Sequence, residues 1–183
     1  MSVPNLYDTN YVYGDGEIPN NIMLIGEAPG EDEDRAGKPF VGQAGKLLAK
    51  LLEEHSFLRR KDIYITNAVK QRPPLNRRPK FLEIQKHRKF LLAEIETVKP
   101  KVIMTLGNTA LQSLFKVELP MSLTGMRNKT FKFKGIPIIA SYHPAALFRS
   151  RIYLEPLIED FKKLRQYQGA NKNENRRTKS ISK

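Results

Sequence analysis

The segment Gly26–Gly45, GEAPGEDEDRAGKPFVGQAG, constrains the fold more than any other stretch of the chain. It holds five glycines, two prolines, five carboxylates and one phenylalanine. A linker would leave the aromatic ring in water, and a core element would bury the charges. A binding loop explains the mixture better, because glycine lets backbone amides approach a ligand and Phe40, behind Pro39, can offer a flat face to a ring.

The loop follows a short, continuously apolar run and precedes a helical leucine pattern over Gly45–Phe57. Apolar runs without alternation are typical of strands buried on both faces of a parallel sheet. Four such strands with helices between them predict an α/β fold, a three-layer α/β/α sandwich around a four-stranded parallel sheet. The strands are expected at Asn21–Ile25, Ile63–Val69, Lys101–Leu106 and Ile136–Ser141, and the further helices at Pro79–Val98, Ala110–Phe115 and Leu154–Gln168.

Open α/β sheets bind ligands at the carboxyl ends of their strands. At that edge of the predicted sheet, three strands deliver polar or aromatic side chains, namely Glu27, Phe40, Asn67 and His143. The segment Gly125–Lys134, which alternates from Thr130 to Lys134 ahead of the fourth strand, is expected to form one arm of a short hairpin. The sequence therefore predicts a ligand pocket where the four side chains meet.

Length and composition fit one domain over residues 1–168, with an irregular arm at residues 1–20 and a disordered basic tail at residues 169–183. The formal net charge of +13 favours a polyanionic partner, above all a nucleic acid. Zero cysteines exclude disulfides, a thiolate nucleophile and any cluster or zinc ion held by cysteine. No apolar run is long enough to cross a bilayer and no leader is recognisable, so we expect a cytoplasmic protein with no membrane partner.

Five separated blocks follow one another along the chain: GEAPG with ED after it, GKPFVGQAG, TNAVKQRPPLNRRP, LGNTAL and SYHPAALFR. In this order they resemble the uracil-DNA glycosylase superfamily, and within it the family 4 enzymes, over about Ile22 to Tyr167. One block alone would be weak evidence, whereas the ordered set is specific. The resemblance implies a substrate of uracil-containing DNA, single- or double-stranded. It also implies hydrolysis of the N-glycosidic bond to leave an abasic site, a step of base excision repair.

Breaking the glycosidic bond of deoxyuridine puts positive charge on the sugar and negative charge on the oxygens of the leaving ring. His143 matches the histidine of the family's HP motif, and a neutral imidazole there can donate a hydrogen bond to a uracil carbonyl, with a buried structural hydrogen bond as the alternative. Glu27 and Glu33 are the carboxylates that can orient a water molecule or offset the charge on the sugar. The resemblance favours Glu27, because Ala28 stands where the superfamily's best-studied branch has a water-positioning aspartate. Glu33 is then expected to shape the pocket near the ring's methyl position and exclude thymine, with a solvated acidic loop end as the alternative.

The other pocket residues are expected to bind the base. Phe40 offers a stacking surface to a base that has left the duplex, with plain core packing as the alternative. The carboxamide of Asn67 can accept from the ring imide of uracil and donate to the adjacent carbonyl, a pattern that cytosine reverses. For Asn67 the alternative is a turn hydrogen bond. Gly26 and Ala28 complete the expected substrate-binding set.

The last block supplies residues for opening the duplex. Leu147, four residues after His143, matches the family's wedge position, where an apolar side chain can fill the space left by an extruded base. Arg149 can bind phosphate. Further backbone contacts are expected from the basic loop after the second strand, with a plain solvated surface as the alternative. The loop residues concerned are Arg72, Asn76, Arg77 and Arg78.

The chain departs from family 4 in one respect. Those enzymes usually hold a four-iron cluster on four cysteines, two ahead of the first strand and two flanking the start of the long helix, and this sequence has none. Gln71 and His87, sixteen residues apart, stand where the second pair is expected and cannot rebuild the site. We therefore predict no cofactor and assign no residue to a metal.

Two other functions are open at this point. A catalytically weak or inactive homologue could use the pocket and the basic surface as a DNA-binding processivity or recruitment module, which the missing cysteines and the basic tail favour. A nucleotide-binding protein that does not act on DNA is disfavoured by the net charge and by Leu147. The leading interpretation is a monomeric, monofunctional uracil-DNA glycosylase, with replication or repair proteins as candidate partners.

Overall fold

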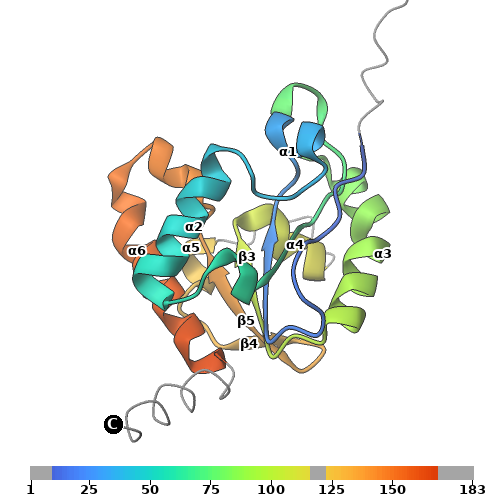
Figure 1. Cartoon of the computed structure of the whole chain (residues 1–183). Helices are drawn as coiled ribbons and strands as arrows, with labels where there is room; N and C mark the ends of the chain where they lie inside the picture. Colours follow the sequence, from blue (N-terminus) through green and yellow to red (C-terminus); the bar gives the residue numbers. More distant parts are fainter. Residues whose placement is uncertain (1–9, 116–122, 169–183) are drawn as a thin grey trace, which may run out of the picture.

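The computed structural model describes residues 10–115 and 123–168, in which a central sheet is flanked by helices (Figure 1). The order of the strands across the sheet is β2-β1-β3-β5-β4. β1, β2, β3 and β5 run parallel, so their carboxyl ends meet at one edge, and the predicted α/β class is confirmed. The strands are β1 (Ile22–Gly26), β2 (Tyr64–Asn67), β3 (Val102–Leu106), β4 (Phe131–Phe133) and β5 (Ile136–Ser141).

The described sheet has five strands where the sequence predicted four, so the predicted number is wrong. The additional strand β4 pairs antiparallel with β5, with Phe131 opposite Ile138, and makes the sheet mixed. In the tight turn between them Lys134 and Gly135 both have positive φ, +48° and +83°, which suits the twist of a short hairpin. The alternation did indicate a hairpin arm, but of the predicted segment Gly125–Lys134 only Phe131–Phe133 is a strand, and the prediction did not count that arm in the sheet.

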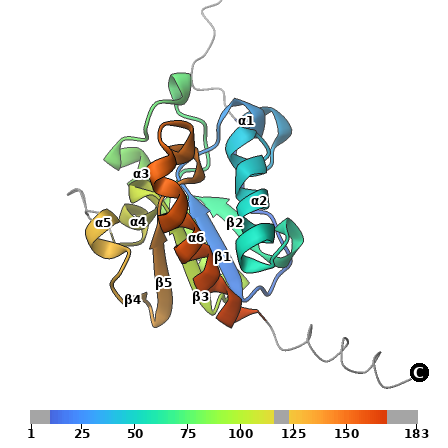
Figure 2. The ribbon, with the colours of Figure 1, turned by 90° about the vertical axis from the view of Figure 1, so that its left-hand side faces the viewer.

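Helices cover both faces of the sheet. α2 (Gln43–Ser56) and α6 (Leu154–Lys163) lie together on one face, and α3 (Phe81–Val98) and α4 (Asn108–Phe115) pack on the other (Figure 2). The shorter elements are α1 (Glu31–Ala36), α5 (Leu123–Met126) and the 3-10 turns η1 (Arg60–Asp62), η2 (Pro74–Asn76), η3 (Pro144–Phe148), η4 (Arg151–Tyr153) and η5 (Leu164–Tyr167).

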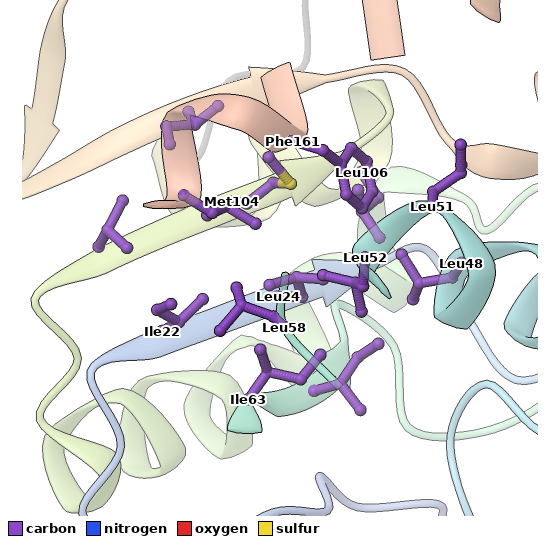
Figure 3. Close-up of a cluster of buried hydrophobic side chains, with 14 of the residues drawn as sticks. Ile22, Leu24, Leu48, Leu51, Leu52, Leu58, Ile63, Met104, Leu106 and Phe161 are labelled. Atoms are coloured by element: carbon purple, nitrogen blue, oxygen red, sulfur yellow. The ribbon is translucent and has the colours of Figure 1, made fainter. Parts of the chain in front are cut away.

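Successive residues of each central strand point to opposite helical layers. Ile22 and Leu24 of β1 belong to the cluster on the α2 and α6 side, which also contains Phe161 (Figure 3). Met23 and Ile25 belong to the cluster on the α3 and α4 side. Because both faces are covered, every residue of β1 is buried, which explains why the sequence shows a continuous apolar run rather than an alternating one.

The starts of α2, α3 and α4 lie two residues from the predicted ones, and there are two larger differences. The last helix, predicted over Leu154–Gln168, is α-helical only to Lys163 and continues as η5. α1 forms inside the segment that the sequence presented as a loop, and four carboxylates in its first turn suit the positive end of a helix dipole. Residues 10–20 form no helix or strand, while residues 1–9 of the predicted arm and the predicted tail at 169–183 lie outside the described residues. None of the described helices is long and apolar enough to span a membrane.

Candidate active site

A cavity of about 440 Å³ opens at the carboxyl edge of the parallel strands. β1 and β2 end side by side, with Gly26 opposite Asn67, and β3 and β5 end with Leu106 opposite Ser141. The segments that leave these four strands form the wall, and the volume is within the range of small-molecule sites. Of the predicted site residues, those that line the cavity are Glu27, Ala28, Glu33, Phe40, Asn67, Asn76, His143 and Arg149.

Phe40 occupies the wall next to the imidazole of His143. The two ring centroids are 5.8 Å apart, with 27° between the ring planes. The Phe40 backbone has φ +56°, and its carbonyl lies so close to Gly45 that a β-carbon at that glycine would overlap it. A β-carbon at Gly26 would overlap both the Phe40 ring and Oδ1 of Asn67. Glycine at these two positions therefore allows the aromatic ring, the carboxamide and the imidazole to share one wall.

Glu33 fixes the shape of the loop. Its Oε1 accepts hydrogen bonds from the backbone N–H groups of Val41 and Gly42, at 2.9 and 2.8 Å. Its Oε2 accepts from the backbone N–H of Gly30 at 3.2 Å. The carboxylate thus ties the segment before α1 to the segment around Phe40, and both of its oxygens are engaged by the loop itself.

Glu27 is held by a residue that the sequence reasoning missed. Its Oε2 accepts a hydrogen bond of 2.5 Å from the hydroxyl of Thr109, a buried residue in the first turn of α4. Nε of Arg78 donates to the same hydroxyl at 3.3 Å, and the backbone N–H of Val69 donates to the Glu27 carbonyl at 3.0 Å. The sequence did contain a signal for this contact. Thr109 belongs to the LGNTAL block, which follows β3 and therefore lies at the same edge of the sheet as Glu27.

His143 is held as a neutral hydrogen-bond donor. Its Nδ1 accepts from the backbone N–H of Ala145 at 3.1 Å. Burial lowers the pKa of His143 to about 4, an effect that the nearby Arg149 adds to and Glu33 opposes. At neutral pH the ring is therefore uncharged, and because Nδ1 is an acceptor the ring proton resides on Nε2. The wall consequently carries an imidazole N–H without a positive charge.

A buried lysine supports the end of β2. Nζ of Lys70 donates to the carbonyl oxygen of Asn67 at 2.8 Å, to Oγ1 of Thr66 at 2.6 Å and to Oε2 of Glu94 at 2.6 Å. Lys70 is fully buried, and this burial lowers its pKa while Glu94 opposes the shift. In the sequence Lys70 begins the basic segment Lys70–Arg78, whereas the structure places its charge beneath the cavity wall.

The predicted DNA contacts divide into two groups. Asn76 and Arg149 line the cavity, and within the described part of the chain no side-chain hydrogen bond or ion pair engages Arg149. Arg72 and Arg77 lie outside the wall and are occupied by protein groups. Nε of Arg72 donates to Oδ1 of Asn76 at 2.7 Å, and the guanidinium of Arg77 makes two bonds of 2.8 Å to the carboxylate of Glu83. In this structure these two arginines therefore stabilise the loop after β2.

Leu147 lies in η3, close to the cavity wall formed by Ala145, Ala146 and Arg149. It is partly buried and packs against the core cluster on the α2 and α6 side. Its neighbour Phe148 is 59% exposed. The segment therefore does present an apolar side chain beside the cavity, but the more exposed one is Phe148, which the sequence reasoning left out.

The family model described as the Uracil DNA glycosylase superfamily matches residues 13–165 of the chain. The chain therefore belongs to the uracil DNA glycosylase superfamily.

Among curated relatives, the chain is similar to the type-4 uracil-DNA glycosylase of Sulfurisphaera tokodaii, with 42% identity over 87% of this chain and 76% of the relative. It is also similar to the type-4 uracil-DNA glycosylase of Thermotoga maritima, with 46% identity over 80% of this chain and 76% of the relative. For the type-4 uracil-DNA glycosylase of Archaeoglobus fulgidus the identity is 42%, over 85% of this chain and 81% of the relative.

The residues around His87 do not fit an iron-sulfur cluster. Such clusters are held by thiolates, and the chain has no cysteine. His87 is buried, its Nδ1 accepts from the backbone N–H of Lys70 at 3.2 Å, and the rings of Tyr11 and Phe90 lie 5.6 and 6.0 Å from its own. The described residues contain no group of three or more His, Cys, Asp or Glu side chains suited to a metal ion.

Proposed function

We propose that this protein is a uracil-DNA glycosylase, which binds a uracil nucleotide extruded from DNA and hydrolyses the bond between base and sugar. The observation that carries the proposal is the single cavity wall in which a carboxamide, an aromatic ring, a neutral imidazole and a carboxylate lie together. Membership of the superfamily and the similarity to type-4 enzymes over most of the chain support it.

In the proposed complex the base lies against Phe40, and the carboxamide of Asn67 reads its edge by accepting from the imide N–H and donating to a carbonyl. The tight approach of Gly26 to both side chains supports this arrangement, since a larger residue would separate them. Ala28 adds a small side chain to the same wall. Glu33 acts on specificity through the loop that it holds, which fixes how far the wall extends beside the ring.

The proposed reaction breaks the bond between C1′ and N1, and the electron pair of that bond leaves with the base. His143 donates from Nε2 to the uracil carbonyl oxygen on which the negative charge collects, and a neutral donor does so without forming an ion pair in the ground state. A water molecule adds its oxygen to C1′ and loses one proton, for which Glu27 is the acceptor. Thr109 holds one oxygen of Glu27 and leaves the other for the water.

Arg149 is the proposed phosphate contact at the cavity mouth, because it lines the wall and is not engaged by another side chain within the described part of the chain. We propose the Leu147 and Phe148 segment as the apolar wedge that fills the stack when the nucleotide leaves it. Arg72 and Arg77 support the neighbouring loop in this proposal, rather than binding phosphate.

The test is cleavage of a labelled uracil-containing oligonucleotide, with alkali to reveal abasic sites, on single-stranded, U·G and U·A substrates. We expect His143→Ala and Asn67→Ala each to slow cleavage by at least about a hundredfold, the scale of losing an electrostatic or positioning contact. His55→Ala is the matched control, because this histidine lies in the last turn of α2, away from the cavity. Wild-type rates in both site variants would reject the assigned site.

A DNA-binding module without activity is the second candidate, favoured by the absence of cysteine. Binding of uracil-containing DNA without turnover of any of the three substrates would support it and reject the enzyme.

We further propose that activity needs no cluster. Iron analysis of protein purified from iron-replete cells should find no stoichiometric iron, and treatment with a chelator should leave the rate unchanged. The monomeric state and the cytoplasmic location stay predictions from the sequence.

A further inference from the structure

Leu75 is an apolar side chain placed almost entirely in water beside the cavity. It is 92% exposed, the highest value among the large apolar side chains that the structure describes as exposed. It lies in η2, at the tip of the loop that follows β2, and the next residue, Asn76, lines the cavity wall. A single exposed leucine is ordinary, but this one stands at the mouth of the proposed substrate site.

The backbone at this tip is in a conformation that leucine disfavours. Leu75 has φ +56° and ψ +26°, and Asn76 has φ +55°, so two consecutive non-glycine residues are left-handed. Glycine would adopt this backbone without strain, and asparagine tolerates it better than a branched apolar residue. Strained conformations persist where the surroundings enforce them, and they concentrate at functional sites.

The loop around Leu75 is braced on both sides. Arg72 bonds to the Asn76 side chain at 2.7 Å, and Arg77 makes its paired bonds to Glu83 at the start of α3. The backbone N–H of Asn76 donates to the carbonyl of Pro73 at 3.0 Å. These contacts hold the tip at a fixed position next to the cavity, so the apolar side chain is presented rather than left free to collapse onto the surface.

We infer that Leu75 is a second apolar contact to duplex DNA, inserting beside the extruded nucleotide from the η2 loop. The inference rests on the proposed function, because the duplex is placed by the base in the cavity. Extruding a nucleotide leaves an unstacked gap, and apolar side chains are the groups that proteins insert there. The net charge of +13 favours a DNA occupant, as does the guanidinium of Arg149 at the same mouth, which no side chain of residues 10–115 or 123–168 engages.

The test compares rates on double-stranded and single-stranded uracil substrates, because only the duplex has a stack to support. In Leu75→Gly we expect the ratio of double-stranded to single-stranded rate to fall about tenfold, the scale of losing one stacking contact. The melting temperature should not fall, since glycine relieves the left-handed backbone.

Two other substitutions separate the side chain from the backbone. Leu75→Asn removes the apolar side chain with a residue that tolerates this backbone, so it should lower the ratio of double-stranded to single-stranded rate as Leu75→Gly does. Leu75→Met keeps an apolar side chain, so its ratio should match that of the wild type. Phe57→Gly is the matched control, because Phe57 is also exposed and left-handed, with φ +60°, at the far end of α2.

A direct binding readout separates this inference from the activity itself. The duplex carries 2-aminopurine beside a 2′-fluorinated deoxyuridine, which resists cleavage, so fluorescence reports unstacking whether or not the protein is catalytic. We expect the wild-type protein and Phe57→Gly to raise the fluorescence and Leu75→Gly to lose most of that rise. An unchanged substrate ratio and unchanged fluorescence in Leu75→Gly would overturn the inference. So would equal losses on both substrates, since they would place the effect in the cavity rather than on the duplex.

Discussion

Replacing Thr109 by valine tests whether the hydroxyl that holds Glu27 contributes to the chemical step. Valine keeps the branched shape of threonine and removes only the hydroxyl. In the structure this hydroxyl donates to Oε2 of Glu27 at 2.5 Å, which is within the range of hydrogen bonds between a hydroxyl and a carboxylate. Without it the carboxylate loses the contact that fixes its orientation at the cavity wall.

The expected loss follows from the type of bond. A hydrogen bond to a charged group contributes about 1.5–3 kcal/mol, and each 1.4 kcal/mol corresponds to a tenfold change in rate. We therefore expect Thr109→Val to slow the single-turnover cleavage rate by about 10- to 100-fold if the whole contribution is realised in the transition state. Thr109→Ser, which keeps the hydroxyl, should stay within about threefold of the wild type, because it retains the donor.

Single-turnover cleavage and fluorescence anisotropy on an uncleavable duplex separate chemistry from binding. We expect Thr109→Val to slow the chemical step and leave the DNA affinity unchanged, because Thr109 is buried and Glu27 acts on water rather than on the DNA backbone. A purely structural role would instead lower the melting temperature and affect both measurements. Equal rates for Thr109→Val and the wild type would refute the assignment of Glu27 as the residue that positions water.

Three further predictions follow from contacts near the cavity. Gly26→Ala should abolish measurable cleavage with little loss of fold in circular dichroism, because its β-carbon would overlap the Phe40 ring and the Asn67 side chain. In calorimetric melting from pH 7 to pH 5, His87→Gln should flatten the loss of stability. Burial lowers the pKa of His87 to about 4, so at this site only the unfolded state gains a proton as the pH falls below about 6.5. His87 alone therefore accounts for about 2 kcal/mol of the stability that the wild type loses by pH 5. Lys70→Met should lower the free energy of unfolding in urea by about 3–5 kcal/mol, because the part-buried carboxylate of Glu94 loses the buried cation that compensates it, whereas an unchanged midpoint would contradict this ion pair.

The sequence was sufficient for the features that depend on local pattern. Continuous apolar runs located β1, β2, β3 and β5, and the rule that parallel strands share a carboxyl edge brought Glu27, Asn67 and His143 to one wall. It was insufficient for β4, because a three-residue strand has too few alternations to distinguish an edge strand from a surface loop. α1 was not predicted for a related reason, because six residues without a buried face show no helical hydrophobic period.

Side-chain partners were the least predictable feature, because they are set by the tertiary fold. Arg77 was interpreted as a DNA contact from its place in a basic loop, but the fold puts Glu83 within 2.8 Å of it. Thr109 lies 82 residues from Glu27 in sequence, and no local pattern connects the two. The number of charges in the basic loop after β2 does not show whether a given cation faces solvent or the protein. Lys70, for example, is completely buried.

The irregular arm explains how the end of β2 is fixed in a chain without cluster ligands. The backbone N–H of Val12 donates to the carbonyl of Lys70 at 2.7 Å, and the backbone N–H of Gly14 donates to Oε1 of Glu94 at 2.8 Å. Tyr11 packs on the ring of His87, 5.6 Å between centroids, while His87 accepts from the backbone N–H of Lys70. The arm, the long helix and the end of β2 are thus joined by hydrogen bonds and ring packing that converge on Lys70. Because Nζ of Lys70 also bonds to the carbonyl of Asn67, the same contacts that hold the arm determine the position of the carboxamide at the cavity wall.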